Sequence, residues 1–350
     1  MADGLPFARG MMLALNPKTY ERLVRPLLFA LPPERAQAVA ELALKRPAIW
    51  RALSPALHAR TGDPCVKLAG LSLANPVGLA AGYDKNCELL PSLAALGFGY
   101  VTGGTVTELP QPGNPKPRVF RYPREESLVN ALGFPSRGLE FVADRLDRGR
   151  AGRGAVPVVV SVSGVSVDAI VRCHRRLEPL ADAIEINVSS PNTAGLRVFQ
   201  EPAALSELLQ EVNRDRSKPL FVKLPPYAHE EAARDRVISL ARACVDNDAG
   251  ALTVANTRPY RDPRLAVGSG GLSGRLLLED TLRMVADIHA EFAGSVPINA
   301  CGGISTGDDA LRALDAGATT VQLLTGLIYR GPGVVKQINR ELAALRHGGR

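Results

Sequence analysis

The chain has 350 residues, of which 46% are hydrophobic, 22% charged and 5% aromatic. The length suits one large domain of the α/β-barrel kind with an appendage, and the composition excludes disordered, collagen-like and polytopic membrane chains. Five widely spaced cysteines without a CxxC pair argue against a disulfide framework or a metal site, and favour a reducing compartment. Because aromatic residues are scarce, we expect no nucleic-acid partner.

The formal net charge of +7 is concentrated near the N-terminus. Residues 1–60 hold nine Lys or Arg against four Asp or Glu, a net charge of +5. Together with apolar helical stripes, this charge favours peripheral contact with a phospholipid surface, although a solvated basic helix is an open alternative. No apolar run reaches the ~18 residues that span a bilayer. We therefore expect a cytosolic protein that at most touches the membrane.

Two short helices are expected in this N-terminal segment. Over residues 20–31 the apolar side chains follow a helical stripe that Pro26 would weaken or kink. A second helix can begin at Pro33 and stop at Pro47. Residues 1–60 are thus predicted to form a two-helix module that either contacts a membrane surface or only covers the core of the following domain.

From about residue 65 the chain alternates short β-rich runs with helical patterns, which is typical of parallel strands joined by crossover helices. The candidate strands cover residues 77–82, 100–106, 156–163, 183–188, 220–224, 251–256, 296–301 and 320–324. Eight strands close a (β/α)8 TIM barrel, predicted here over residues 61–350. No G-x-G-x-x-G turn follows any of these runs, so a Rossmann fold is disfavoured. Residues 65–76 and 117–131 are predicted hairpins at the bottom and the mouth of the barrel.

Polar residues gather where the predicted strands end. The first strand ends in Ala80-Ala81-Gly82-Tyr83-Asp84-Lys85, and later strands end in Asn187-Val188-Ser189-Ser190-Pro191-Asn192, in Lys223 and in Asn256-Thr257. Amide, hydroxyl and ammonium groups should therefore converge on one mouth, with neither a carboxylate pair nor a histidine. This set suits a planar, anionic, amide-bearing ligand and does not suit metal-dependent hydrolysis.

The last two predicted strands end in Cys301-Gly302-Gly303-Ile304 and in Leu324-Thr325-Gly326. Glycines at the ends of the seventh and eighth strands let backbone N–H groups approach a phosphate, although a pair of tight turns would also use them. The sequence therefore predicts a ligand that carries a phosphate.

The strand-end residues named above, together with other stretches of the chain, match the sequence pattern of a known family. The chain resembles the class 2, quinone-dependent dihydroorotate dehydrogenases over about residues 20–332. The stretches that carry the resemblance are Asn75-Pro76-Val77-Gly78-Leu79-Ala80-Ala81-Gly82 with Asp84-Lys85, Gly104-Thr105-Val106-Thr107, Pro110-Gln111-Pro112-Gly113-Asn114, Asn130 with Gly133-Phe134, residues 187–197, Gly270-Gly271-Leu272-Ser273-Gly274-Arg275 and, near the start, Leu31-Pro32-Pro33-Glu34-Arg35-Ala36.

The resemblance implies flavin mononucleotide (FMN) as cofactor and dihydroorotate as substrate. The implied cofactor contacts are Ala81, Gly82, Thr105, Asn187, Lys223, Gly274, Gly302, Gly303, Leu324, Thr325 and Gly326. The implied substrate contacts are Lys85, Asn130, Gly133, Phe134, Asn187, Asn192, Asn256 and Thr257. Ser190 stands where the family has its catalytic base, and Lys223 would stabilise negative charge on the reduced flavin.

The implied reaction is the oxidation of dihydroorotate to orotate in pyrimidine biosynthesis, with electrons passed to a membrane quinone that enters between the N-terminal helices. The family resemblance further implies a peripheral enzyme on the cytoplasmic face of the cell membrane, and we expect it to act as a monomer. A divergent FMN oxidoreductase for another cyclic amide or a soluble acceptor, and a phosphate-ligand-binding module without enzymatic activity, are the alternatives.

The chain departs from the family pattern at several positions. The usual Gly-x-Asn-x-Gly-Lys-Asn motif is replaced by residues 160–166, so that an amide contact to the flavin is expected to be lost at Val162. Pro135 replaces an Asn, Arg258 replaces a small hydroxyl residue, and Leu224-Pro225-Pro226-Tyr227 follows Lys223. We expect these changes to affect cofactor affinity and rate while leaving the main polar residues in place.

Overall fold

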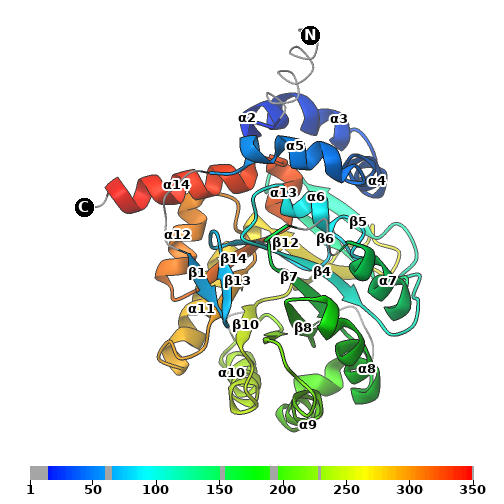
Figure 1. The fold of residues 1–350 in the computed structure, drawn as a ribbon, viewed down its shortest axis with the longest axis vertical. Helices are drawn as coiled ribbons and strands as arrows, with labels where there is room; N and C mark the ends of the chain where they lie inside the picture. Colours follow the sequence, from blue (N-terminus) through cyan, green and yellow to red (C-terminus); the bar gives the residue numbers. More distant parts are fainter. Residues whose placement is uncertain (1–14, 60–64, 150–153, 190–195, 228–229, 349–350) are drawn as a thin grey trace.

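A computed structural model describes residues 15–59, 65–149, 154–189, 196–227 and 230–348 of the chain. Eight parallel strands form a closed barrel, with helices around it and a group of helices over one end (Figure 1). The barrel strands are β3 (Val77–Leu79), β4 (Tyr100–Val106), β7 (Val158–Val162), β8 (Ala183–Asn187), β9 (Leu220–Lys223), β10 (Ala251–Val254), β13 (Ile298–Cys301) and β14 (Thr320–Leu323). All eight predicted strands, and with them the TIM barrel, are confirmed.

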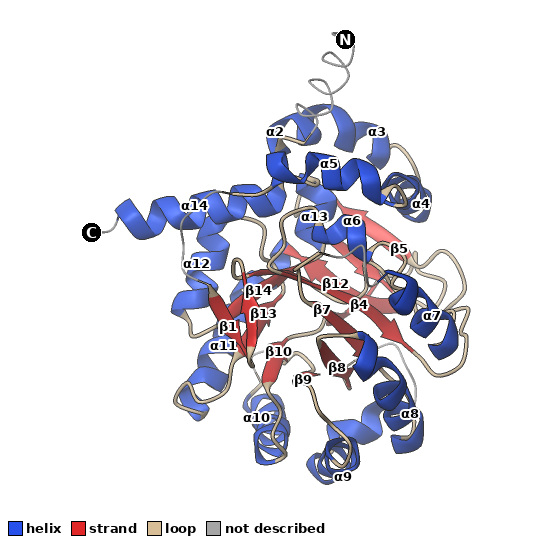
Figure 2. Ribbon diagram, in the orientation of Figure 1, coloured by secondary structure: helices blue, strands red, loops and turns tan. Residues whose placement is uncertain are grey.

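The strands lie around the barrel in the order β10-β13-β14-β3-β4-β7-β8-β9. Because a parallel barrel is covered on its outside by helices and filled on its inside by side chains, its strands are buried on both faces. Figure 2 shows the helices outside the strands. The outer helices are α6 (Leu90–Ala94), α7 (Leu139–Gly149), α8 (Val167–Leu177), α9 (Pro202–Asn213), α10 (Glu231–Asp246), α11 (Leu278–Glu291), α12 (Gly307–Asp315), α13 (Thr325–Arg330) and α14 (Val334–Gly348).

Both predicted hairpins are present. The first consists of β1 (Val66–Leu68) and β2 (Leu71–Leu73), and its Leu68 and Leu73 are fully buried against side chains at the bottom of the barrel. The second consists of β5 (Val119–Tyr122) and β6 (Ser127–Asn130), and it joins β11 (Arg258–Arg261) and β12 (Ser269–Gly274) in a sheet with the order β11-β12-β6-β5. This four-stranded sheet forms one wall above the barrel mouth.

The N-terminal segment is helical, but the expectation of two helices is wrong. Residues 17–29 form α2 (Pro17–Thr19), the π-helical turn η1 (Tyr20–Val24) and α3 (Arg25–Phe29), followed by α4 (Pro33–Leu44) and α5 (Pro47–Leu57). The second helix, α4, ends just before Pro47 as expected, and Pro47 itself begins a third helix, since proline fits the first turn, where its missing N–H is not needed. The wide turn η1 precedes Pro26, which cannot donate a hydrogen bond within a regular helix.

Candidate functional site

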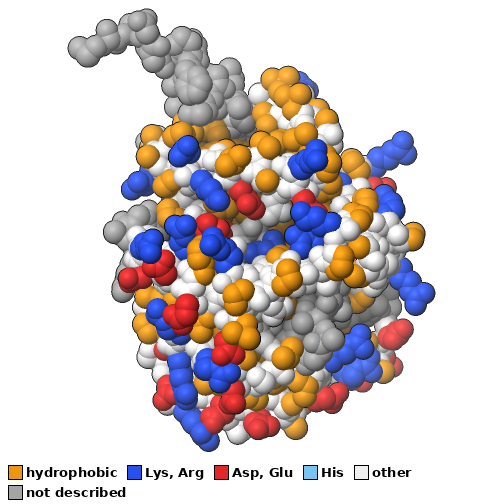
Figure 3. Space-filling model, turned by 90° about the vertical axis from the view of Figure 1, so that its right-hand side faces the viewer, with side chains coloured by type: hydrophobic (Ala, Val, Ile, Leu, Met, Phe, Trp, Pro, Cys, Tyr) orange, Lys and Arg blue, Asp and Glu red, His pale blue; other side chains and the backbone are white. Residues whose placement is uncertain are grey.

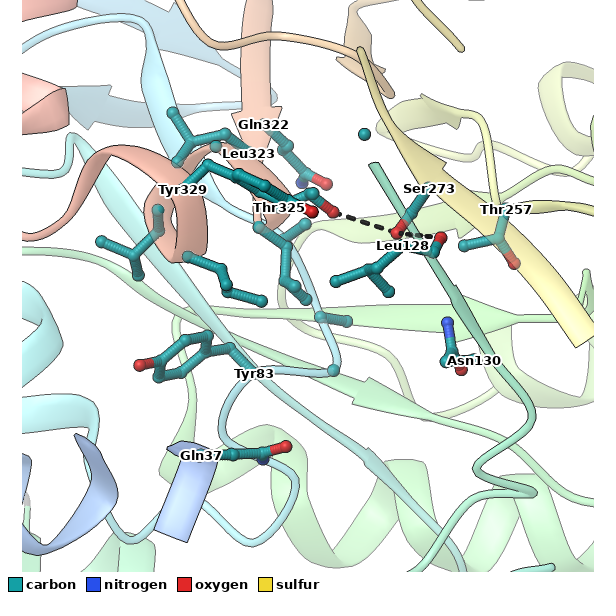
Figure 4. Close-up of a pocket in the computed structure, with 18 of the residues that line it drawn as sticks. Gln37, Tyr83, Leu128, Asn130, Thr257, Ser273, Gln322, Leu323, Thr325 and Tyr329 are labelled. Carbon is teal, nitrogen blue, oxygen red and sulfur yellow. Dashed lines mark hydrogen bonds between the residues drawn. The ribbon is translucent and has the colours of Figure 1, made fainter. Parts of the chain in front are cut away.

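A cavity of about 490 Å³ runs from the barrel mouth to the N-terminal helices. Its polar end is formed by the carboxyl ends of the barrel strands and by the sheet containing β6 and β12. Its apolar end lies under η1, α3, α4 and α5. Figure 4 shows residues from both parts facing the same space: Asn130, Thr257 and Ser273 lie on one side, and Gln37 and Tyr83 on the other.

Two lysines reach the polar end of the cavity. Lys85 follows β3, its Nζ donates to the carbonyl of Gly82 at 2.7 Å, and burial lowers its pKa. Lys223 is the last residue of β9 and is 5% exposed. Burial favours its neutral form, but the nearby Cys301 and Glu185 side chains outweigh burial and raise the pKa of Lys223. The site therefore offers an ammonium group at its floor and a second lysine amino group at its side.

Amide and hydroxyl groups at the polar end are held by one another. Asn187 Nδ2 donates to Thr105 Oγ1 at 3.1 Å, and the Asn187 carbonyl oxygen Oδ1 accepts from the Ser189 hydroxyl at 2.8 Å. Asn256 Nδ2 donates to Ser189 Oγ at 2.9 Å, and the backbone N–H of Thr257 donates to Asn256 Oδ1 at 2.7 Å. This chain of hydrogen bonds fixes the orientation of each amide before any ligand arrives.

The glycine-rich strand ends pack tightly behind the cavity. Gly303 has a φ of +81°, and a Cβ there would lie 2.5 Å from the Leu278 backbone. A Cβ on Gly326 would lie 2.8 Å from the carbonyl oxygen of Ile304. Thr325 Oγ1 donates to Ser273 Oγ at 3.0 Å, as Figure 4 shows. The glycines thus allow close packing behind the wall, and Gly302, Gly303 and Gly326 themselves line the cavity, where their backbone N–H groups can face a phosphate.

The apolar end is closed by side chains from the N-terminal helices, with a few polar groups among them. The helical residues that line it are Tyr20, Val24, Leu28, Phe29, Ala36, Gln37, Ala40, Ala43, Leu44 and Trp50. Arg121 of β5 donates to the carbonyl oxygens of Phe29 and Leu31 at 3.3 and 3.1 Å, and its guanidinium lies 4.3 Å from the centre of the Phe29 ring. Arg121 thus ties the helices to the sheet above the barrel.

The structure brings the predicted site residues together wherever it describes them. The residues that line this one cavity are Ala81, Gly82, Lys85, Thr105, Asn130, Gly133, Phe134, Asn187, Lys223, Asn256, Thr257, Gly274, Gly302, Gly303, Leu324, Thr325 and Gly326. Ser190 and Asn192 lie outside the described residues. The role of each residue toward substrate or cofactor stays a prediction at this point.

Sequence reasoning assigned no site role to several residues of the cavity, among them Tyr83, Ser273, Cys301 and Gln322, although the first three lie in stretches that it singled out. Gln322 could have been found, because a glutamine in the middle of an otherwise apolar buried strand needs a polar environment. Ser273 and Tyr83 gave no such signal, since they face the cavity only through the placement of β12 and of the loop after β3.

The residues that depart from the family pattern do not all lie where the sequence suggested. Val162 faces the apolar core outside the barrel, not the cavity, so no ligand contact is lost there. The neighbouring hydroxyls hold the local network instead, since Ser161 Oγ lies 3.1 Å from Thr105 Oγ1 and Ser163 Oγ donates to the Asn187 carbonyl at 2.8 Å. Arg258 pairs with Asp280 at 2.7 Å. Pro135 does line the cavity.

The described part of the chain lacks two features that would point to another kind of site. It contains no group of three or more His, Cys, Asp or Glu residues that could hold a metal ion. Nor does any helix within it combine the length and the apolar character needed to cross a membrane.

Comparisons with known proteins agree with this geometry. Residues 64–345 match the family model described as dihydroorotate dehydrogenase. The chain is 40% identical over 341 residues to a dihydroorotate dehydrogenase (quinone) of Roseiflexus sp. (strain RS-1), with 92% of each chain covered. It is 41% identical over 337 residues to the protein of that name from Anaeromyxobacter dehalogenans (strain 2CP-C), again with 92% of each covered. The crystal structure of DHODH from Eimeria tenella in complex with ferulenol superposes with a TM-score of 0.80 at 31% identity, covering 92% of this chain and 95% of that one.

Proposed function

Because the chain belongs to the dihydroorotate dehydrogenase family, in its quinone-dependent class, we propose that the two ends of its cavity serve the two halves of the family reaction. That reaction oxidises dihydroorotate to orotate with a quinone as electron acceptor, in pyrimidine biosynthesis. The observation that carries the proposal is the continuity of the cavity: an end lined by lysines and amides opens directly into an end lined by apolar helices.

The polar end binds the substrate in this proposal. Dihydroorotate is a small ring with a carboxylate and two amide-type edges, and it needs cations together with groups that both donate and accept hydrogen bonds. Lys85 supplies positive charge, while Asn130, Asn187, Asn256 and Thr257 supply the amides and the hydroxyl. Asn192, which follows the described part of that loop, would add another amide. Gly133 and Phe134 shape the side of the cavity next to β6.

The residues along the cavity floor fit FMN. A wall of glycines leaves room for its phosphate against Gly302, Gly303, Thr325 and Gly326, at positions where a Cβ on Gly303 or Gly326 would collide with the backbone behind it. Ala81, Gly82, Thr105, Gly274 and Leu324 line the space for its ring system. Lys223 lies at the floor, where its charge favours an anionic ring edge. When bound, the flavin accepts a hydride from the substrate and passes the electrons on to the quinone.

Ser190 is the proposed base. Oxidation of dihydroorotate removes a proton from C5 and a hydride from C6, and Ser190 would take the proton. A serine hydroxyl is a poor base by itself, so it needs a neighbouring hydroxyl or water to carry the proton away. Thr257 at the end of β10 is the proposed neighbour, and the lysines and amides stabilise the negative charge that develops on the ring.

The apolar end is the proposed quinone site, and the helices around it the proposed membrane contact. Leu23, Leu27 and Leu42 are 64%, 74% and 67% exposed on the outside of these helices. Figure 3 shows hydrophobic and basic side chains interspersed at this end of the molecule. Apolar side chains interspersed with Lys and Arg suit the boundary between acyl chains and anionic headgroups. We place the protein peripherally on the cytoplasmic face of the membrane.

The proposal is tested by the visible spectrum of the purified protein. We expect bound flavin to absorb in the visible range, and anaerobic addition of dihydroorotate to bleach it. Ser190→Ala should keep the flavin but lose the bleaching, whereas Ser239→Ala on the outer helix α10 should bleach normally. A colourless protein would contradict the FMN assignment, and normal bleaching of the Ser190 variant would contradict the assignment of the base.

A further inference from the structure

The interior of the barrel is filled by side chains in layers, each with four members from alternate strands. Following the strand registers around the barrel places one residue of β4, β8, β10 and β14 in a middle layer. Its members are Thr102, Glu185, Thr253 and Gln322. The next layer toward the cavity comes from the other four strands and contains Ala80, Ser161, Lys223 and Cys301.

The middle layer is polar throughout, although such layers are normally filled by branched apolar residues. All four members are at most 1% exposed. The Thr253 hydroxyl donates to Glu185 Oε2 at 2.8 Å, and Asn299 Nδ2 from the layer below lies 3.3 Å from Thr253 Oγ1. Thr102 Oγ1, Glu185 Oε1 and both amide atoms of Gln322 make no hydrogen bond to any described residue. The layer therefore holds a carboxylate with one oxygen unused.

A carboxylate that is fully removed from water is stable in its ionised form only with a compensating charge. Glu185 interacts electrostatically with three titratable side chains of the barrel, Tyr100, Lys223 and Cys301, and of these Lys223 carries positive charge. Lys223 lies one layer above Glu185, and its partner in the β9–β10 register is Thr253, the residue that donates to Glu185. The two buried charges thus share one set of neighbours.

We propose that Glu185 is the counter-ion of Lys223 and acts as a positioning residue that keeps the ammonium group charged at the cavity floor. Glu185 does not line the cavity, so it touches neither substrate nor flavin in this arrangement. The pairing is inferred from the barrel registers together with the electrostatic interaction of the two side chains, and only its consequence for the flavin rests on the proposed function.

The pairing is tested by a double-mutant cycle on the urea unfolding of the full-length chain without added flavin. Glu185→Gln and Lys223→Met should each lower the unfolding midpoint, since each leaves one buried charge unpaired. The unfolding midpoint of the double variant should fall by less than the sum of the two single decreases.

The control is Glu178→Gln, which removes another buried carboxylate, outside the barrel at the end of α8. Its effect on the midpoint should add to that of Lys223→Met. Additive losses in the Glu185–Lys223 cycle would overturn the pairing. If Glu185→Gln alone does not fold, recovery of a folded protein in the double variant supports the pairing, and no recovery contradicts it.

The consequence for the cofactor is tested by the reduction midpoint potential of the bound flavin from about pH 6 to about pH 9. Without Glu185 the pKa of Lys223 should fall, because burial is then opposed by Cys301 alone, so the difference in potential between Glu185→Gln and the unaltered protein should change with pH. If Glu185 had only a structural role, the difference in potential between the variant and the unaltered protein would not change with pH. Glu178→Gln should show such a constant difference. A constant difference for Glu185→Gln would overturn the positioning role. A protein that binds no flavin would contradict the proposed function and leave the unfolding cycle as the test of the pairing.

Discussion

The two ends of the cavity are built in different ways. At the polar end, buried side chains on barrel strands are locked by hydrogen bonds, as in the chain from Thr105 through Asn187 and Ser189 to Asn256. At the other end, short helices present apolar side chains inward and leave Leu27 74% exposed outward. The oxidation of dihydroorotate needs polar groups at fixed positions, and these groups lie on the rigid barrel. The reduction of quinone needs only an apolar enclosure, and the N-terminal helices added to the barrel form it.

The largest effect is expected at the floor of the polar end. Lys223→Met should lower the rate of dihydroorotate-driven flavin reduction by about 10² to 10³, since it removes a fixed positive charge beside the reacting ring. Stopped-flow bleaching under anaerobic conditions measures this rate. Lys67→Met, at an exposed lysine of the β1–β2 hairpin, is the control and should react normally. An unchanged rate of flavin reduction in Lys223→Met would contradict the electrostatic role proposed for Lys223.

The loop after β3 lies between the two ends and contains the buried Asp84. The free energy of unfolding should therefore depend on pH through this carboxyl group. Burial raises the pKa of Asp84 from the ordinary 3.8 to about 6, although hydrogen bonds from the backbone of Leu89 and Glu88 oppose the shift. Between these values the folded protein holds a proton that the unfolded chain has lost. The unfolding free energy should therefore fall as pH rises through this window, by about 3 kcal/mol in total.

Asp84→Asn should lack this fall, and urea unfolding of both proteins between about pH 4 and pH 7 measures it. The other carboxylates titrate in both proteins, so the difference between the two curves isolates Asp84. A difference that does not vary with pH would contradict the buried environment assigned to this loop.

Narrowing the apolar end should affect the second half of the reaction alone. Ala40→Phe places a large ring in the cavity from α4 and should raise the KM for a short-chain quinone by about tenfold, equivalent to about 1.4 kcal/mol. Reduction of the flavin by dihydroorotate should keep its rate. The matched control is Ala38→Phe on the same helix, because Ala38 is exposed. Equal effects of Ala40→Phe on both half-reactions would show that the two ends do not work separately.

The smallest effect on chemistry is expected at the outer surface of the helices. Replacing Leu23, Leu27 and Leu42 by Ser should weaken binding to vesicles containing anionic lipid by several-fold and leave turnover with a water-soluble quinone unchanged. Vesicle co-sedimentation gives the binding. Leu109→Ser, at a residue 70% exposed on the barrel side of the molecule, should not alter it. Unchanged binding by the triple variant would place the membrane contact elsewhere.

Much of the fold was predictable because strand ends in this chain carry strong signals. Runs such as Leu220–Lys223 are apolar and short, and they end in polar or glycine residues that face the barrel mouth. The helix boundaries near Pro26 and Pro47 were less predictable, since proline both ends one helix and begins the next. In the site, the side assigned to Val162 was wrong because a strand buried on both faces shows no alternation that reveals which residues point inward.

In the proposed mechanism, one continuous cavity couples dihydroorotate oxidation to quinone reduction. Anaerobic double mixing tests it most directly: the protein is first bleached with one equivalent of dihydroorotate and then mixed with a short-chain quinone. We predict that the flavin absorbance returns with the quinone in the unaltered protein and in Ala38→Phe, and more slowly in Ala40→Phe. A flavin that dihydroorotate bleaches but that quinone does not re-oxidise would show that the cavity does not couple the two half-reactions.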